Sequence, residues 1–124
     1  MSYKYNTMKL LAACILILSL SYIDQTQIRY GDYKNFDAEK NHKVGTIESK
    51  QVYIKIPAYE GIKTGEYEKG TAKYTQALKE TTMEYRRVMR VTAKKQDLKL
   101  IVEMGGISDY PSKDITENCI SHIN

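Results

Sequence analysis

Histidine and cysteine, the usual metal ligands and nucleophiles of a catalytic centre, are rare in this chain. The two histidines are His42 and His122, and neither belongs to a full set of ligands at the spacing of a metal site. The sequence also contains no phosphate-binding glycine loop, no nucleophile elbow and no zinc-protease motif. We therefore predict no catalytic, metal or cofactor site and no enzyme activity.

Side chains suited to binding gather between residues 71 and 96. Several follow a 4-3-4-3-4 spacing, which is typical of a helix that packs against a partner: Tyr74, Leu78, Thr81, Tyr85, Val88 and Thr92. This face is interpreted either as core or subunit packing or as a surface that holds unfolded chains. The candidate client-binding residues are Tyr74, Leu78, Tyr85, Met89, Arg86, Arg87 and Arg90.

A cationic cluster lies mostly off that spacing and extends to the end of the expected helix. Its members are Arg86, Arg87, Arg90, Lys94 and Lys95. Cations near a helix C-terminus are favoured by the helix dipole. The cluster is therefore interpreted either as a solvated face or as an anion-binding surface.

The first 21 residues are typical of a secretory signal peptide. Lys4 and Lys9 precede eleven uncharged residues, 10–20, and small side chains surround the expected cleavage site before Tyr22. The apolar run is shorter than the ~20 residues that a membrane-spanning helix needs. We therefore expect export, with lipid anchoring through Cys14 as the alternative.

The rest of the chain divides into a linker and one small domain. Residues 22–42 show no period of two or 3.6 and are interpreted as a flexible linker. Without residues 1–21 the chain has 17 basic and 15 acidic residues, a net charge of +2 that does not require a nucleic-acid or membrane partner. Cys119 is then the only cysteine, and we expect it to be a small buried residue on the last helix.

Residues 43–124 are predicted to form an α+β domain with a small antiparallel-rich sheet or barrel. A domain of this size buries only ~60–65% of its unfolded surface, so we expect oligomerisation to stabilise it. Alternation of apolar and polar residues predicts a strand at residues 97–104. A short strand is also expected at 43–48, where the alternation is incomplete, and a third at 106–110, where Gly105-Gly106 permits a tight turn.

Two helical regions are expected. Residues 58–96 should form a protruding helix or short helical hairpin, preceded by Pro57 in its first turn. Residues 115–123 should form a short C-terminal helix, capped by Asp114 with Glu117 three residues later. By period alone, residues 49–56 favour a strand.

Three segments carry a resemblance to the OmpH-like (Skp) family of periplasmic chaperones. They read KVGTIESKQVYIKIPAY, AKKQDLKLIVEMGG and YPSKDIT, in the order in which that family places a strand, a helix, a returning strand and a capped last helix. The resemblance implies that residues 49–56 are helical, with Ser49 as N-cap. It also implies a periplasmic homotrimer whose strands share a central barrel, through Val44, Ile47, Leu98, Leu100 and Val102.

This resemblance implies a holdase, an ATP-independent chaperone that binds unfolded outer-membrane or envelope proteins. The family inserts a long coiled hairpin where this chain has only residues 58–96, which would make its helical arms short. A non-catalytic structural or adaptor module with the same oligomeric fold is the alternative. A third possibility is a weak anion or membrane-surface binder that uses residues 86–99.

Overall fold

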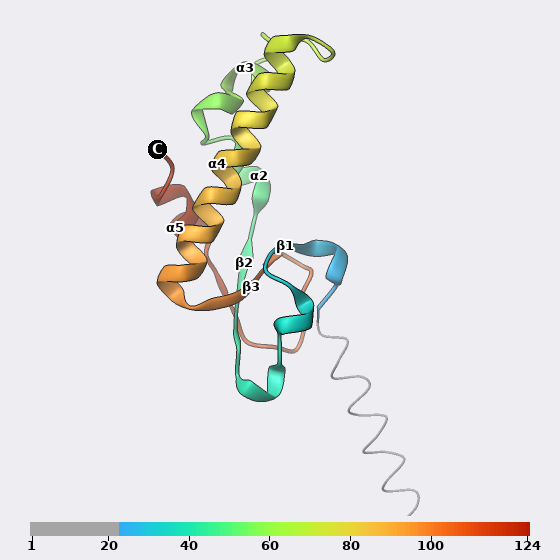
Figure 1. The fold of residues 1–124 in the computed structure, drawn as a ribbon, viewed down its shortest axis with the longest axis vertical. Helices are drawn as coiled ribbons and strands as arrows, with labels where there is room; N and C mark the ends of the chain where they lie inside the picture. The colour runs from blue at the N-terminus through green and yellow to red at the C-terminus, as the bar shows by residue number, and fades with distance from the viewer. Residues whose placement is uncertain (1–22) are drawn as a thin grey trace, which may run out of the picture.

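The computed structural model describes residues 23–124, which form a mixed α+β fold with an open four-stranded sheet (Figure 1). The predicted signal peptide and the lipid-anchor alternative at Cys14 lie outside the described residues. The strands are β1 (Ile28–Tyr30), β2 (Lys43–Ile47), β3 (Leu98–Glu103) and β4 (Ser112–Asp114). The α-helices are α2 (Ser49–Tyr53), α3 (Glu60–Lys63), α4 (Ala72–Gln96) and α5 (Thr116–Ser121). Short 3₁₀ helices are η1 (Gln25–Gln27), η2 (Tyr33–Asn35), η3 (Ala38–Lys40) and η4 (Pro57–Tyr59).

The sheet is mostly parallel, so the prediction of an antiparallel-rich sheet is wrong. Its strand order is β1-β3-β2-β4, with β2 parallel to both β3 and β4 and only β1 antiparallel to β3. The helical segment between β2 and β3 returns the chain to the same end of the sheet, which is the crossover that a parallel pair requires. The strands predicted at 43–48 and 97–104 correspond to β2 and β3.

The third predicted strand, at residues 106–110, is not one. Ile107 makes only an isolated antiparallel bridge with Ile23, and β4 begins later, after Pro111. The edge of β3 is already occupied by β1, so the chain uses residues 104–111 to cross to the free edge of β2. There β4 pairs through residues 112–114, with Val44 opposite Ser112.

Residues 23–42, which the sequence analysis assigned to a linker, pack against the sheet as part of the domain. Three aspartates organise this segment: Asp24, Asp32 and Asp37 each accept a hydrogen bond from the backbone N–H two residues later, at 3.0 Å. Each bond caps one short 3₁₀ helix. Asx turns of this kind carry no apolar period, which is why a search for periodicity finds nothing here.

Two apolar layers lie on opposite faces of the sheet. The larger layer, between the sheet and the helices, contains Ile47, Val52, Ile56, Tyr85, Val88, Met89, Ala93, Ile101, Ile115 and Cys119. The smaller layer contains Ile23, Val44, Leu100 and Val102, covered by Ile28, Tyr33, Phe36, Ile107 and Tyr110. The buried position of Cys119 confirms the sequence prediction for that residue.

Gly45 lies where the strand and the last helix come closest. A Cβ atom there would lie 2.8 Å from Leu98 Cδ1 and 3.0 Å from Ile115 Cγ1, closer than ordinary packing allows. The glycine therefore lets Ile115, at the start of α5, sit directly on β2. It also explains why the apolar alternation of this strand is incomplete in the sequence.

The helices follow the sequence predictions with local corrections. Residues 49–53 are helical, as the resemblance implied, but Glu48 occupies the N-cap position and Ser49 is the first helical residue. The helix expected at 58–96 is divided: η4 and α3 come first, a turn at residues 64–71 follows, and the Thr71 side chain then caps α4. The last helix is shorter than the predicted 115–123, and Ile115 instead of Asp114 occupies its N-cap position. Asp114, one residue earlier, accepts a hydrogen bond from Thr116 N at 3.0 Å.

Candidate binding surfaces

Helix α4 positions most of the predicted client-binding residues, and it has two different environments along its length. Its 25 residues span about 37 Å at 1.5 Å per residue. The C-terminal half packs on the sheet and α5, whereas the N-terminal half extends past the sheet with α3 beside it (Figure 1). We call residues 57–84, the part beyond the sheet, the helical arm.

The apolar client-binding candidates divide between these two environments. Tyr85 and Met89 are only 5% and 2% exposed, because they lie in the larger core layer. They are core residues rather than surface residues, which corrects the sequence prediction for both. Leu78, on the arm, is 45% exposed, and Tyr74 is half-buried.

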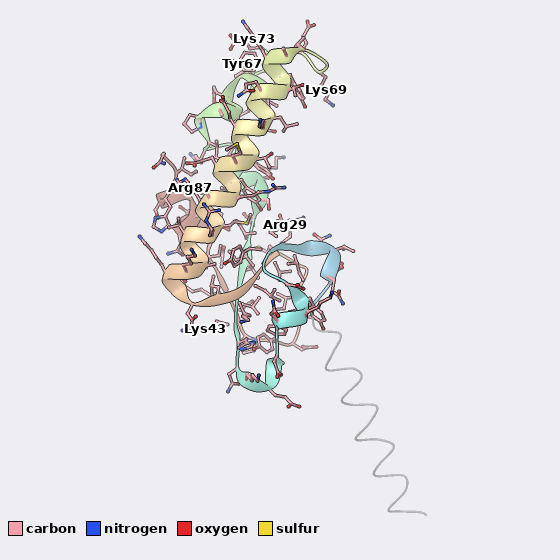
Figure 2. All side chains as sticks on the ribbon, in the orientation of Figure 1. Arg29, Lys43, Tyr67, Lys69, Lys73 and Arg87 are labelled. Carbon is pink, nitrogen blue, oxygen red and sulfur yellow. The ribbon has the colours of Figure 1, made fainter. Side chains whose placement is uncertain are left out.

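The arginine candidates also divide. Arg86 and Arg90 are exposed, whereas Arg87 donates from Nε and Nη2 to the two carboxylate oxygens of Glu84, at 2.6 and 2.9 Å. Arg87 Nη2 also donates to the carbonyl of His122 at 2.5 Å, and Glu84 accepts from Asn124 N at 2.8 Å. Arg87 (labelled in Figure 2) therefore fastens the C-terminal segment to α4 instead of facing a ligand.

This ion pair changes the titration of its carboxyl group. The hydrogen bonds from Arg87 hold the pKa of Glu84 below its ordinary value, and the backbone N–H of Asn124 acts in the same direction. Charge-assisted, two-point bonds between a guanidinium and a carboxylate are the stronger kind of hydrogen bond in proteins. The pair therefore stabilises the packing of α5 and the residues after it.

An exposed stripe that the sequence analysis did not identify runs along the outer side of α4. It consists of Lys79, Met83, Arg86 and Arg90, all exposed and spaced 4-3-4, so they share one helix face. Met83 is 62% exposed, a high value for a large apolar side chain. The 4-3-4 spacing of this stripe is visible in the sequence. The buried face of the same helix has the same spacing and more apolar residues, so spacing alone does not identify the exposed stripe.

The five residues expected to form an oligomer core are packed inside one chain. Val44, Ile47, Leu100 and Val102 are buried, and Leu98 packs against the larger core layer. Three of them, Val44, Leu100 and Val102, lie on the second face of the sheet, where the segment 23–42 and the loop before β4 cover them. Burying these residues therefore needs no second copy of the chain.

A polar cluster joins four elements at the end of the sheet near α2. The hydroxyl of Ser49 donates to Glu103 Oε2, and Ser49 N donates to Glu103 Oε1 at 3.1 Å. Tyr85 OH lies 2.5 Å from Ser49 Oγ, and Arg29 Nε lies 3.2 Å from Glu103 Oε2. Because a carboxylate only accepts, Ser49 is the donor to Glu103 and the Tyr85 hydroxyl donates to Ser49.

This arrangement makes the cluster a tie between elements. Burial raises the pKa of Tyr85 to about 12, so its hydroxyl keeps its proton at neutral pH. Both hydrogen-bonding roles of the Ser49 hydroxyl are taken by neighbouring side chains. The cluster links β1, α2, α4 and β3, and the Tyr85 ring also packs on that of Tyr53, with ring centroids 4.5 Å apart.

Within residues 23–124, no group of three or more histidine, cysteine, aspartate or glutamate side chains is placed to hold a metal ion. None of the helices in this part of the chain combines the length and the apolar character needed to cross a bilayer. Comparison with protein-family models, with curated proteins and with solved structures returned no match.

Proposed function

We propose that this protein is an ATP-independent holdase of the bacterial cell envelope that binds unfolded segments of outer-membrane or envelope proteins through its helical arm. The observation that carries the proposal is the exposure of Leu78 and Met83 on the arm, 45% and 62%. Exposed cations, Lys79, Arg86 and Arg90, lie on the same face as Met83. A client segment with apolar and acidic residues matches such a surface.

The order of the elements supports the same proposal. A strand, a short helix, a proline step, a long helix, a returning strand and a capped last helix follow one another, as the OmpH-like resemblance implies. The arm is short, however, and cannot enclose a large client. We therefore propose contact with short client segments instead of a closed cage.

The size of the apolar contact sets the expected affinity. Complete burial of one fully exposed large apolar side chain contributes ~1.5–3 kcal/mol. Because only 45% of Leu78 and 62% of Met83 remain to be buried, the two together contribute roughly 1.6–3 kcal/mol. Association itself costs at least about 4 kcal/mol, so one arm alone binds weakly. Useful affinity requires several arms on one client, each raising the local concentration for the next.

The test is suppression of aggregation of a denatured outer-membrane barrel protein on dilution from urea. We expect the wild-type protein to suppress aggregation at several-fold molar excess, and the double variant L78S/M83S to be markedly weaker. The matched control is Met104→Ser, because Met104 is also exposed, at 44%, but follows β3 and is not part of the arm. Absence of suppression by the wild-type protein, or equal loss with Met104→Ser, would contradict the proposal.

A second candidate is an adaptor that binds a folded acidic partner. The composition of the outer stripe of α4 favours it, since three of its four residues are cations. Binding of this kind weakens strongly with salt, because exposed charges are screened over ~10 Å at 0.1 M ionic strength. Capture of one folded partner, lost at moderate salt and unaffected by L78S/M83S, would support the adaptor over the holdase.

A further inference from the structure

A cleft lies at the end of the sheet where β2 and β3 begin, far from the tip of the arm. Its volume is about 720 Å³, within the range of ~300–1,000 Å³ usual for small-molecule sites. Figure 2 shows Lys43, one of its lining residues, at the opposite end of the molecule from Lys69 and Lys73. The lining residues are Asn41, His42, Lys43, Val44, Lys95, Gln96, Asp97, Leu98, Tyr110, Pro111, Ser112 and Lys113.

Three cations from three different elements line this cleft. Lys43 begins β2, Lys95 lies in the last turn of α4, and Lys113 lies in β4. The only carboxylate in the lining is that of Asp97. The three amines outnumber this carboxylate, so the cleft has an excess of positive charge. Holding like charges in one cleft is unfavourable.

These lysines are not neutralised by ion pairs within the part of the chain that the structure describes. The ion pairs there join Arg29 to Glu103, Lys63 to Glu60 and Arg87 to Glu84. Lys113 Nζ donates to the neutral amide oxygen of Gln96 at 3.1 Å, which positions the amine without cancelling its charge. The cleft therefore offers amine donors to an anion.

The walls of the cleft combine apolar surface with fixed backbone. Leu98, Tyr110 and Pro111 supply apolar surface beside the lysines. The Tyr110 hydroxyl donates to the carbonyl of His42 at 2.5 Å, and His42 Nδ1 accepts from Asp37 N at 2.9 Å. These bonds hold the loop before β4 against the start of β2, so the cleft is largely formed before any ligand binds.

We propose that this cleft binds a small soluble phosphate monoester that carries an apolar group. The phosphate would lie among the amines of Lys43, Lys95 and Lys113, and the apolar group would lie against Leu98, Tyr110 and Pro111. Three amines and one carboxylate leave a formal lining charge of +2, which matches a phosphate dianion better than a single carboxylate. Lysine amines bind phosphate as point charges, which fits a cleft without arginine.

The test is a titration of the protein with phenyl phosphate at constant ionic strength, followed by calorimetry and by NMR shifts of the cleft residues. We expect saturable one-to-one binding, with inorganic phosphate binding more weakly because it lacks the ring. The double variant K43Q/K113Q should bind at least ~10-fold more weakly, since one charge-assisted hydrogen bond contributes more than the 1.4 kcal/mol that corresponds to a factor of ten. The matched control K69Q/K73Q removes the same charge at the tip of the arm and should change the affinity by less than about twofold.

Three results would overturn the proposal. One is the lack of saturable binding at millimolar phenyl phosphate, and another is an equal loss of affinity in both double variants. The third is preference for phosphatidylglycerol vesicles over phenyl phosphate through the same lysines, which would assign the cleft to a lipid headgroup. None of these outcomes depends on aggregation suppression by the arm, so the two proposals are tested separately.

Discussion

The two-sided packing of the sheet makes a quantitative prediction for Leu100→Ala. Leu100 is fully buried in β3, in the smaller core layer beneath the segment 23–42. Leucine to alanine removes about three methylene equivalents, or roughly 2.4 kcal/mol of transfer free energy at ~0.8 kcal/mol each. The cavity that remains adds to this loss, and such substitutions cost about 2–5 kcal/mol in total. We expect the free energy of unfolding to fall by about 3 kcal/mol, because short 3₁₀ helices can settle partly into the space.

Urea unfolding followed by far-UV circular dichroism, at about 1 and 100 µM protein, measures both the loss and its dependence on concentration. If residues 23–42 of the same chain cover Leu100, the unfolding midpoints should be the same at both concentrations. A sheet completed by sister copies behaves differently, because hundredfold dilution lowers the apparent stability by roughly 2.7 kcal/mol for each association step. Lys99→Ala is the control, since the neighbouring side chain is exposed and should change stability by less than ~0.5 kcal/mol.

Two results would refute the reasoning. A loss below about 1 kcal/mol would mean that Leu100 is not held between the sheet and the N-terminal segment. A midpoint that falls on dilution would mean that the apolar layer is completed between chains, as the sequence analysis expected.

Other predictions concern the C-terminal segment. Glu84 has a lowered pKa in the folded protein, so its contribution to stability is fully present above its ordinary value of 4.5 and is lost as the pH falls through the lower folded-state pKa. Glu84→Gln should therefore lower the free energy of unfolding by about 1 kcal/mol at pH 7, a value reduced for partial exposure, and by less at pH 3. Urea unfolding at both pH values measures this loss, with the exposed Glu80→Gln as the control. An equal loss at both pH values would contradict the prediction. Cys119 is fully buried and burial raises its thiol pKa, so native protein should react with a thiol reagent at pH 8 only as fast as it opens, at least ~100-fold more slowly than in urea. Reaction of the native thiol at the unfolded rate would show that α5 is not packed as described.

The sequence predicts those helices and strands in which the pattern of apolar residues shows which side is buried. From Thr81 to Thr92 the 4-3-4 spacing marks the side of α4 that is buried, and both threonines are satisfied within the helix by bonds to carbonyl oxygens four residues earlier, at 2.7 and 2.8 Å. Short runs rich in apolar residues likewise identify β2 and β3, although both strands are covered on both faces and consecutive residues are buried, so strict alternation is lost. Each of these patterns lies within one segment of the chain, so it can be recognised before the positions of distant segments are known.

The parts that the sequence does not predict depend on distant partners. Whether β3 lies parallel or antiparallel to β2 depends on the path of the intervening chain. The strand β1 has only three residues, so its pairing with β3 leaves no periodic pattern. The aspartates at 24, 32 and 37 are the one local signal in that segment, and they indicate capped turns only when they are considered together.

The sequence also cannot show which of the candidate binding residues on α4 are exposed. An apolar helix face has the same spacing whether it packs on its own sheet or binds another chain, so Tyr85 and Met89 looked equivalent to Leu78. Only the position of the sheet separates them, because α4 is longer than the surface that supports it.

Because α4 is longer than the sheet beneath it, L78S/M83S can be tested for binding without unfolding the protein. Leu78 and Met83 are exposed on the part of α4 that extends past the sheet, so replacing them with serine removes no buried contact with the two core layers. Exposed substitutions of this kind change stability by about 0.5 kcal/mol or less, whereas the residues of α4 that belong to the larger core layer begin with Tyr85. Loss of aggregation suppression in L78S/M83S would therefore report a lost binding surface and not an unfolded protein, and unchanged urea unfolding of that variant is the measurement that establishes it.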